Sequence, residues 1–128
     1  MIFNFSCPRS SNILLKKSKH FRSFYCAIPD EEKTKYRKTI SFIADFDESL
    51  INIVKVMKDD AYYIWTIGNR FVGKREIPNA EILQDLMESY GLALFFKAER
   101  QILNKIQPKK NNYSRTMEKE KIMIFHRN

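Results

Sequence analysis

Apolar side chains recur at steps of three and four over residues 43–57, the spacing of one face of an α-helix. This stripe consists of Ile43, Phe46, Leu50, Ile53, Val54 and Met57. Upstream, Pro29 is followed by three acidic residues, and carboxylates are stabilised beside the unpaired N–H groups of a first helical turn. The pattern predicts helix from Asp30 to Lys58, either as one helix or as two that break around Thr39.

The next feature is a run of almost wholly apolar, aromatic or β-branched residues, Ala61 to Ile67. Because polar and apolar residues do not alternate in this run, it predicts a strand covered on both faces, as in a parallel sheet between helices. Gly68, Asn69 and Gly73 predict a loop at the end of the strand, since these residue types tolerate the backbone angles of turns.

A second helix is predicted to begin at Pro78-Asn79 and to end before Gly91. Its apolar face would consist of Ile82, Leu83, Leu86, Met87 and Tyr90. Two strands follow, residues 92–97 and 121–125, and no helix joins them, so they are expected to pair antiparallel. The polar loop between them, residues 104–120, is long for a compact domain, so it is either functional or disordered.

Positive charge is concentrated toward both ends of the chain, which has 128 residues and a net charge of +8. Residues 1–29 carry five basic and no acidic side chains, and residues 96–128 carry nine basic and three acidic ones. The stretch between them carries nine basic and twelve acidic side chains. Two basic segments around a mildly acidic middle suit a polyanion such as nucleic acid, with a solvated charged surface as the alternative.

Several classes of protein do not fit the sequence. No apolar run approaches the roughly 18 residues of a membrane helix, and the apolar start is interrupted too early for a signal peptide. Cys7 and Cys26 have no His at ligand spacing, so no metal site is expected, and both are predicted to be reduced thiols of a cytoplasmic protein. For residues 1–29 an organellar transit peptide is the alternative. His20 and His126 lack partners at catalytic spacing and are assigned no role.

Three segments carry a resemblance to a known family. They are VMKDDAYYIWTIGNR, then VGKREIPNAEILQDLMESYGL, then a basic stretch from Arg100 to Asn111 that leads to Thr116-Met117 and the last strand. In order and spacing they resemble the C-terminal part of S-adenosylmethionine-dependent DNA methyltransferases that act on the amino group of adenine or cytosine. The chain departs from the family pattern in the basic stretch, where Leu103 replaces Pro and Ile106-Gln107 replaces Arg-Met.

The resemblance implies an α/β fold, a partial class I methyltransferase (Rossmann-like) sheet flanked by helices. Its last strand would insert antiparallel beside its predecessors. The chain would then consist of a basic, poorly defined N-terminal segment, residues 1–29, and the C-terminal portion of a methyltransferase-like domain, residues 30–128. The strand from Ala61 to Ile67 should lie beside a further parallel strand that this chain does not clearly supply. An apolar strand with an open edge favours association, so we expect a split enzyme that docks onto a second subunit, or a truncated gene product with poor solubility.

Two motifs carry the chemistry of such enzymes. A Gly-rich turn holds S-adenosylmethionine, and a Ser/Asp/Asn-Pro-Pro-Tyr loop grips the flipped-out base. The chain has only three glycines, so no such turn can be assembled. The segment nearest to the catalytic loop is Ser6-Cys7-Pro8, with one Pro and with Arg9 in place of the aromatic residue. That segment is either a degenerate catalytic loop or unrelated, and the chain alone is expected to bind no cofactor.

The candidate DNA contacts lie in the loop after the strand from Ala61 to Ile67 and in the basic stretch before the last strand. Asn69 and Arg70 come after the strand at the sheet edge where such folds bind ligands, although Asn69 could equally cap a turn. The predicted DNA-binding residues are Asn69, Arg70, Arg75, Arg100, Lys105, Lys109, Lys110 and Arg115. Tyr62, Tyr63 and Trp65 are expected in the core rather than stacked on a base, because they lie within the strand.

The leading interpretation is a C-terminal fragment or split subunit of a site-specific DNA methyltransferase of the restriction-modification type, inactive by itself. Its expected partners are DNA and a second subunit or missing N-terminal half that binds S-adenosylmethionine. Adenine and cytosine are both open as targets. Two alternatives are a small basic nucleic-acid-binding protein without enzymatic activity and an interaction module whose charge is incidental.

Overall fold

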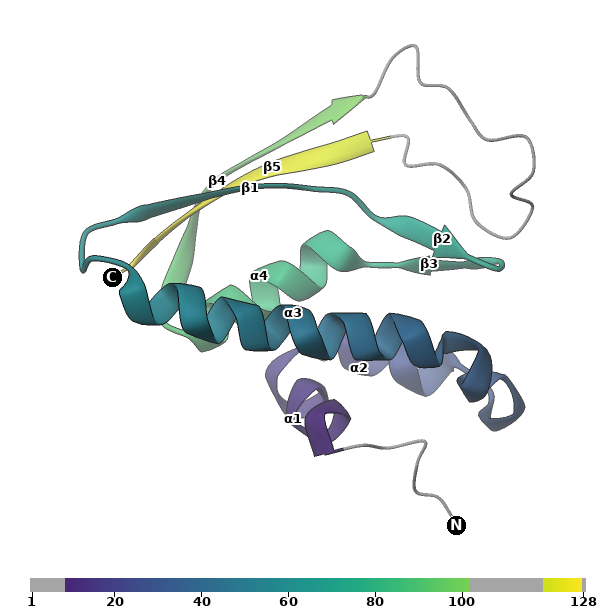
Figure 1. Ribbon diagram of the computed structural model, residues 1–128. Coiled ribbons are helices and arrows are strands. Elements are labelled where there is room, and N and C mark those ends of the chain that lie inside the picture. Colours follow the sequence, from purple (N-terminus) through teal and green to yellow (C-terminus); the bar gives the residue numbers. More distant parts are fainter. Residues whose placement is uncertain (1–8, 102–118, 128) are drawn as a thin grey trace. The chain divides into compact units, whose positions relative to one another are not determined.

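The structure is a computed structural model that describes residues 9–101 and 119–127 (Figure 1). The chain forms two compact units, residues 1–57 and residues 58–128. Within the described residues the first unit is helical, and the second combines strands with an α-helix. The molecule is therefore a mixed α/β structure with an antiparallel sheet. The Rossmann-like arrangement and the division of the chain into residues 1–29 and 30–128 remain predictions.

The described part of the first unit consists of α1 (Arg9–Lys17), α2 (Lys19–Ala27), the 3-10 helix η2 (Asp30–Tyr36) and α3 (Arg37–Val56). Helices α1 and α2 occupy a segment for which the sequence pattern predicted no element. Helix α2 begins after Ser18, whose Oγ accepts a hydrogen bond from the Phe21 N–H at 3.0 Å. Serine favours this position because it satisfies an N–H that has no partner within the helix. Of the two alternatives for residues 30–58, one helix or two, the structure has two, and they meet at Tyr36, where η2 passes into α3.

Aromatic rings form much of the buried interior of the first unit. The rings of Phe21 and Tyr25 stack with centroids 5.8 Å apart, and those of Phe24 and Tyr36 meet edge to face at 6.0 Å. All four side chains are buried. In the predicted apolar stripe of α3, the buried members are Ile43 and Leu50, and the half-buried ones are Phe46, Ile53, Val54 and Met57. The pattern therefore placed the inward side of α3 correctly.

The second unit is built on a three-stranded sheet of β1 (Tyr62–Ile67), β4 (Leu92–Gln101) and β5 (Lys119–Arg127). The strand order is β1-β5-β4, and β5 pairs antiparallel with both neighbours. The expected antiparallel pairing of the last two strands is confirmed, and so is the insertion of the last strand beside its predecessors. A separate hairpin of β2 (Arg70–Val72) and β3 (Arg75–Ile77) follows β1.

Helix α4 (Asn79–Ser89) lies between the hairpin and β4 in the chain and supplies much of the core of the second unit. Its buried side chains are Ala80, Ile82, Leu83, Leu86 and Met87, which confirms four of the five residues of the predicted apolar face. The fifth, Tyr90, is half-buried and follows the last helical residue. From β5, Met123 and Phe125 are fully buried. Gly91 follows the helix with a φ of 87°, the left-handed conformation that favours glycine after a helix end.

The surroundings of β1 differ from the prediction. The strand pairs antiparallel with β5, and burial alternates along it, with Tyr62 55% and Ile64 65% exposed. The predicted two-sided burial in a parallel sheet is therefore wrong for the described structure, as is a core position for Tyr62. Tyr63 and Trp65 are half-buried and stack on each other at 5.2 Å. Apolar side chains on both faces of a strand allow both faces to be buried, but the described residues cover only one face of β1.

The central position of β5 can be tested by shortening one of its buried side chains. Phe125→Ala should lower the free energy of unfolding by about 3–5 kcal/mol, because it leaves a cavity where the ring was packed. Urea denaturation followed by circular dichroism measures the change. Phe95→Ala, at a position 66% exposed on the neighbouring strand β4, is the matched control and should change stability by no more than about 0.5 kcal/mol. Equal losses in both variants would contradict the assignment of the core.

Candidate nucleic-acid interface

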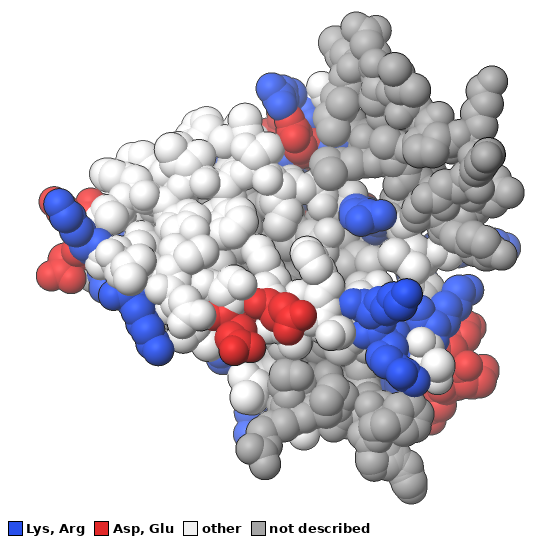
Figure 2. Space-filling view, in the orientation of Figure 1, with Lys and Arg blue, Asp and Glu red and all other residues white. Residues whose placement is uncertain are grey.

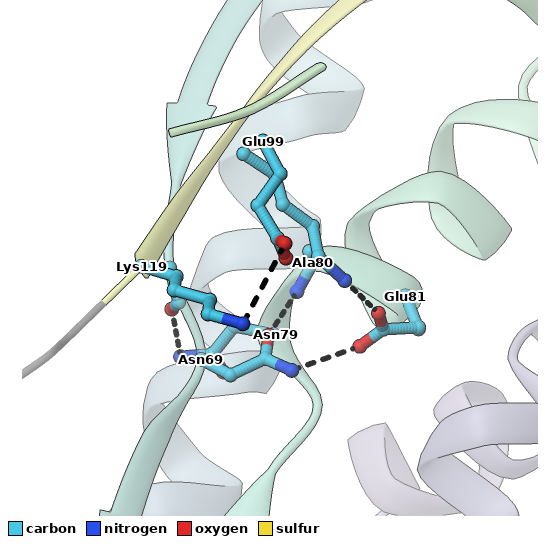
Figure 3. A network of polar contacts seen from close by, with 8 residues as sticks. Asn69, Asn79, Ala80, Glu81, Glu99 and Lys119 are labelled. Carbon is cyan, nitrogen blue, oxygen red and sulfur yellow. Dashed lines mark hydrogen bonds and ion pairs between the residues drawn. The ribbon is translucent and has the colours of Figure 1, made fainter. Parts of the chain in front are cut away.

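A polar network joins the loop after β1 to the first turn of α4 (Figure 3). The Asn69 Oδ1 accepts a hydrogen bond from the Ala80 N–H at 3.0 Å, and its Nδ2 donates to Glu81 Oε1 at 3.1 Å. In the opposite direction, Asn79 Nδ2 donates to the Gly68 carbonyl at 3.2 Å. Both ends of the segment that contains the hairpin are thus fixed to each other.

The same network extends to the central strand through Glu81. The Lys121 Nζ of β5 lies 2.5 Å from Glu81 Oε2 and forms an ion pair with it. Burial alone would raise the pKa of the Glu81 carboxyl, but the hydrogen bonds from Lys121 and Asn69 favour the ionised form and hold that pKa below its ordinary value. Glu81 therefore connects α4, β5 and the loop after β1.

Two roles were considered for Asn69 from the sequence, capping and contact with DNA. Its amide accepts a hydrogen bond from a backbone N–H of α4 and donates one to Glu81, so it caps the start of that helix from a neighbouring loop. The side chain is half-buried. Capping is the role that the geometry describes, and a contact between Asn69 and DNA remains a prediction.

The β2–β3 hairpin presents basic side chains. Val72 pairs with Arg75, so Gly73 and Lys74 form a two-residue turn, and Gly73 has the positive φ of 63° that such turns require. The side chains of Arg70 and Lys74 are exposed, and neither side chain forms an ion pair or hydrogen bond with another described residue. Arg75 is half-buried.

Arg100 lies elsewhere, near the end of β4, and is already paired. It forms an ion pair with Glu120 of β5, directly opposite in the strand register. Diagonally across the same two strands, Lys119 Nζ lies 3.9 Å from Glu99 Oε1. A phosphate would have to compete with Glu120 for the Arg100 guanidinium, so this residue is a weaker candidate than Arg70.

Lys74 is not among the DNA-binding residues predicted from the sequence. The sequence does contain a pattern that could have identified it. Gly73 and Lys74 form a short segment between residues typical of strands, and such a segment predicts the tip of a hairpin. Several predicted site residues lie outside the described residues: the basic side chains Lys105, Lys109, Lys110 and Arg115, and the segment Ser6, Cys7 and Pro8.

Within residues 9–101 and 119–127, no three or more His, Cys, Asp or Glu side chains gather in a way that could hold a metal ion. In the same part of the chain, no helix has the length and apolar character needed to cross a membrane.

Comparison with known proteins gives one informative similarity. The chain is 29% identical to the Type II methyltransferase M.MvaI of Kocuria varians over 111 residues, which cover 81% of this chain and 24% of that protein. The chain thus spans about a quarter of the length of this curated relative. Neither a protein-family model nor a solved structure matches the chain. The similarity supports a relationship to methyltransferases.

The depressed pKa of Glu81 predicts how the network responds to acid. A carboxyl whose pKa is lower in the folded than in the unfolded state stabilises the fold above its unfolded pKa, and this contribution is lost as the pH falls through the folded pKa. The difference in unfolding free energy between the wild type and Glu81→Gln should therefore be constant from pH 7 to about pH 5.5 and shrink below the ordinary carboxyl value of 4.5. Urea titrations at each pH measure it.

Lys121→Met provides the control for this experiment. It removes the ion-pair partner while leaving the carboxyl in place, so the acid-sensitive part of the stability should also shrink in this variant. A Lys121→Met protein that keeps the full acid dependence of the wild type would show that the network does not cause it.

Proposed function

We propose that the chain is the C-terminal portion of a site-specific DNA methyltransferase, either a fragment or a split subunit, and that it transfers no methyl groups by itself. The observation that carries the proposal is the similarity to a Type II methyltransferase over 81% of the chain, which corresponds to only 24% of the relative. The proposal assigns the larger remainder of such an enzyme either to a missing N-terminal half or to a second subunit.

The strand arrangement agrees with this proposal. The resemblance in sequence implied a last strand inserted antiparallel beside its predecessors, and β5 lies between β1 and β4 with antiparallel pairing on both sides. The helix that follows the hairpin also begins one residue after Pro78, in the segment that resembles the family. These features support the proposed placement within the larger enzyme.

The proposed role of this chain within the enzyme follows from what methyl transfer requires. Methyl transfer to an exocyclic amine needs a bound S-adenosylmethionine, acceptors for the amine hydrogens and a surface on which the extruded base can stack. The three glycines of the chain and the single Pro of Ser6-Cys7-Pro8 do not supply the motifs that do this in the family. The proposed role of this chain is to complete the sheet and to contact DNA.

The hairpin is the described element best suited to contact a phosphate backbone. Arg70 and Lys74 are exposed, lie within a few residues of each other and have no described counter-ion. The network around Asn69 and Ala80 fixes both ends of the hairpin, so little order has to be gained on binding. Phosphate contacts of this kind position a protein on DNA without reading its sequence.

The DNA contact can be measured by titrating a fluorescently labelled duplex with the full chain at several salt concentrations. Each phosphate contact contributes about 0.9 to the slope of log K against log salt, so the double variant Arg70→Ala/Lys74→Ala should reduce the magnitude of the slope by about 2. Lys58→Ala, an exposed lysine just before β1, is the matched control and should leave the slope unchanged. A wild-type slope near zero would contradict binding driven by phosphates.

DNA binding alone does not distinguish a portion of a methyltransferase from a small basic nucleic-acid-binding protein without enzymatic activity. A chimera with the relative distinguishes the two. In the Kocuria varians methyltransferase, the 111 matched residues are replaced by the matching part of this chain, with the intact relative as the reference. The chimera should transfer tritiated methyl groups from S-adenosylmethionine to DNA. A soluble chimera that binds S-adenosylmethionine but transfers none would favour the non-enzymatic alternative.

A further inference from the structure

One face of the three-stranded sheet is apolar and exposed. On β1 it carries Tyr62 and Ile64, which are 55% and 65% exposed. On β4 it carries Phe95 and Phe96, which are 66% and 49% exposed. The strand register places Ile64 and Phe96 on either side of Ile124 in β5. These side chains are called the outer face below.

A β-bulge in β4 enlarges the outer face. The register shifts between Leu94 and Phe96, so Phe96 opposes Ile124 while Phe95 has no partner in the register with β5. Both rings are exposed. The Phe95 ring contacts Tyr62 across the sheet at 5.4 Å, and Tyr62 stacks on His126 at 4.4 Å. A bulge that leaves two neighbouring aromatic rings exposed is costly in water unless something covers them.

The two edges of the sheet differ in character. Strand β4 ends in charged side chains, among them Lys97, Glu99 and Arg100, and charges of this kind discourage strand pairing at an edge. Strand β1, Tyr62 to Ile67, has no charged residue, and within the described residues it pairs only through the edge that faces β5. Figure 2 shows few charged side chains over the region where Figure 1 draws β1.

We propose that the outer face and the open edge of β1 form the docking surface for the polypeptide that carries the cofactor-binding part of the enzyme. This inference rests on the proposed function. The partner would add an extended segment to β1 and cover the outer face with apolar side chains.

The size of the surface fits such a partner. Full burial of an aromatic side chain removes roughly 150–250 Å², so covering the four exposed side chains would remove on the order of 400 Å². That is about half of the roughly 800 Å² that each partner contributes to a standard interface, and the six-residue edge of β1 adjoins it. A second copy of this chain would bring no cofactor motif, whereas the relative is about four times as long as the part that matches.

The test uses the full chain as bait in extracts of the cells that make it, with captured proteins identified by mass spectrometry. The variants Ile64→Asp and Phe95→Asp place a charge on the outer face. Phe42→Asp is the matched control, because Phe42 is 62% exposed on α3, outside the sheet. Circular dichroism and thermal unfolding establish that each variant is folded, and the milder Phe95→Ser replaces any variant that is not.

The proposal predicts that the wild type and Phe42→Asp capture a polypeptide whose own sequence contains a Gly-rich turn and a Pro-Pro-Tyr loop. The two outer-face variants should capture at least tenfold less of it. Equal capture by all variants would overturn the docking surface and leave the proposed function intact. Capture of a polypeptide without these motifs, lost in the outer-face variants, would keep the surface and overturn the function.

Two further outcomes contradict the proposed partner. If light scattering shows a dimer of the chain that Ile64→Asp dissociates and Phe42→Asp does not, the occupant of the outer face is a second copy. If the wild-type chain is a monomer that captures no polypeptide with the cofactor motifs, both the docking surface and the split-subunit form of the function fail.

Discussion

The second unit depends on the placement of β5 between β1 and β4. Those two strands do not pair with each other, so the backbone hydrogen bonds that hold them in one sheet all run to β5. The same strand directs Met123 and Phe125 into the core. Tyr62 pairs with His126, which lies far along the chain, so the sheet forms only after a large loop has closed. Closing this loop costs conformational entropy, and the burial of side chains of β5 offsets that cost.

The polar network turns this central strand into a support for the hairpin. Lys121 of β5 holds Glu81, Glu81 accepts from Asn69, and Asn69 caps the start of α4. The segment between Asn69 and Ala80 therefore begins and ends at points fixed to the sheet. A hairpin attached in this way presents Arg70 and Lys74 from a defined position, which favours contacts with a regularly spaced backbone such as that of DNA.

Sequence patterns predicted the parts of the fold that follow from local chemistry. The apolar face of α4, its end before Gly91 and the antiparallel pairing of β4 with β5 were all expected, because spacing and connection length determine them. The surroundings of β1 were not predicted correctly. An apolar run shows that a strand can be buried on both faces, but residues elsewhere in the chain determine whether it is. Helices α1 and α2 were also missed, because their short apolar repeats are interrupted by basic residues.

The candidate site was predictable in its residues and less so in their roles. The loop after β1 was singled out by Asn69 and Arg70, yet the engagement of Asn69 with α4 depends on a contact across eleven positions that no local pattern encodes. Lys74 became a candidate only when the pairing of Val72 with Arg75 placed it at a turn. Arg100 became a weaker candidate for contact with DNA because it pairs with Glu120 of another strand, which the sequence alone did not indicate.

The strand order also has a consequence for how the protein is made. Strand β1 leaves the ribosome well before β5, the only described strand with which it pairs. At about 5–20 residues per second, the roughly 50 residues between them take several seconds to synthesise. Throughout that interval the uncharged sequence from Tyr62 to Ile67 has no neighbour within the described sheet, so nascent chains would depend on chaperones or on a partner made at the same time.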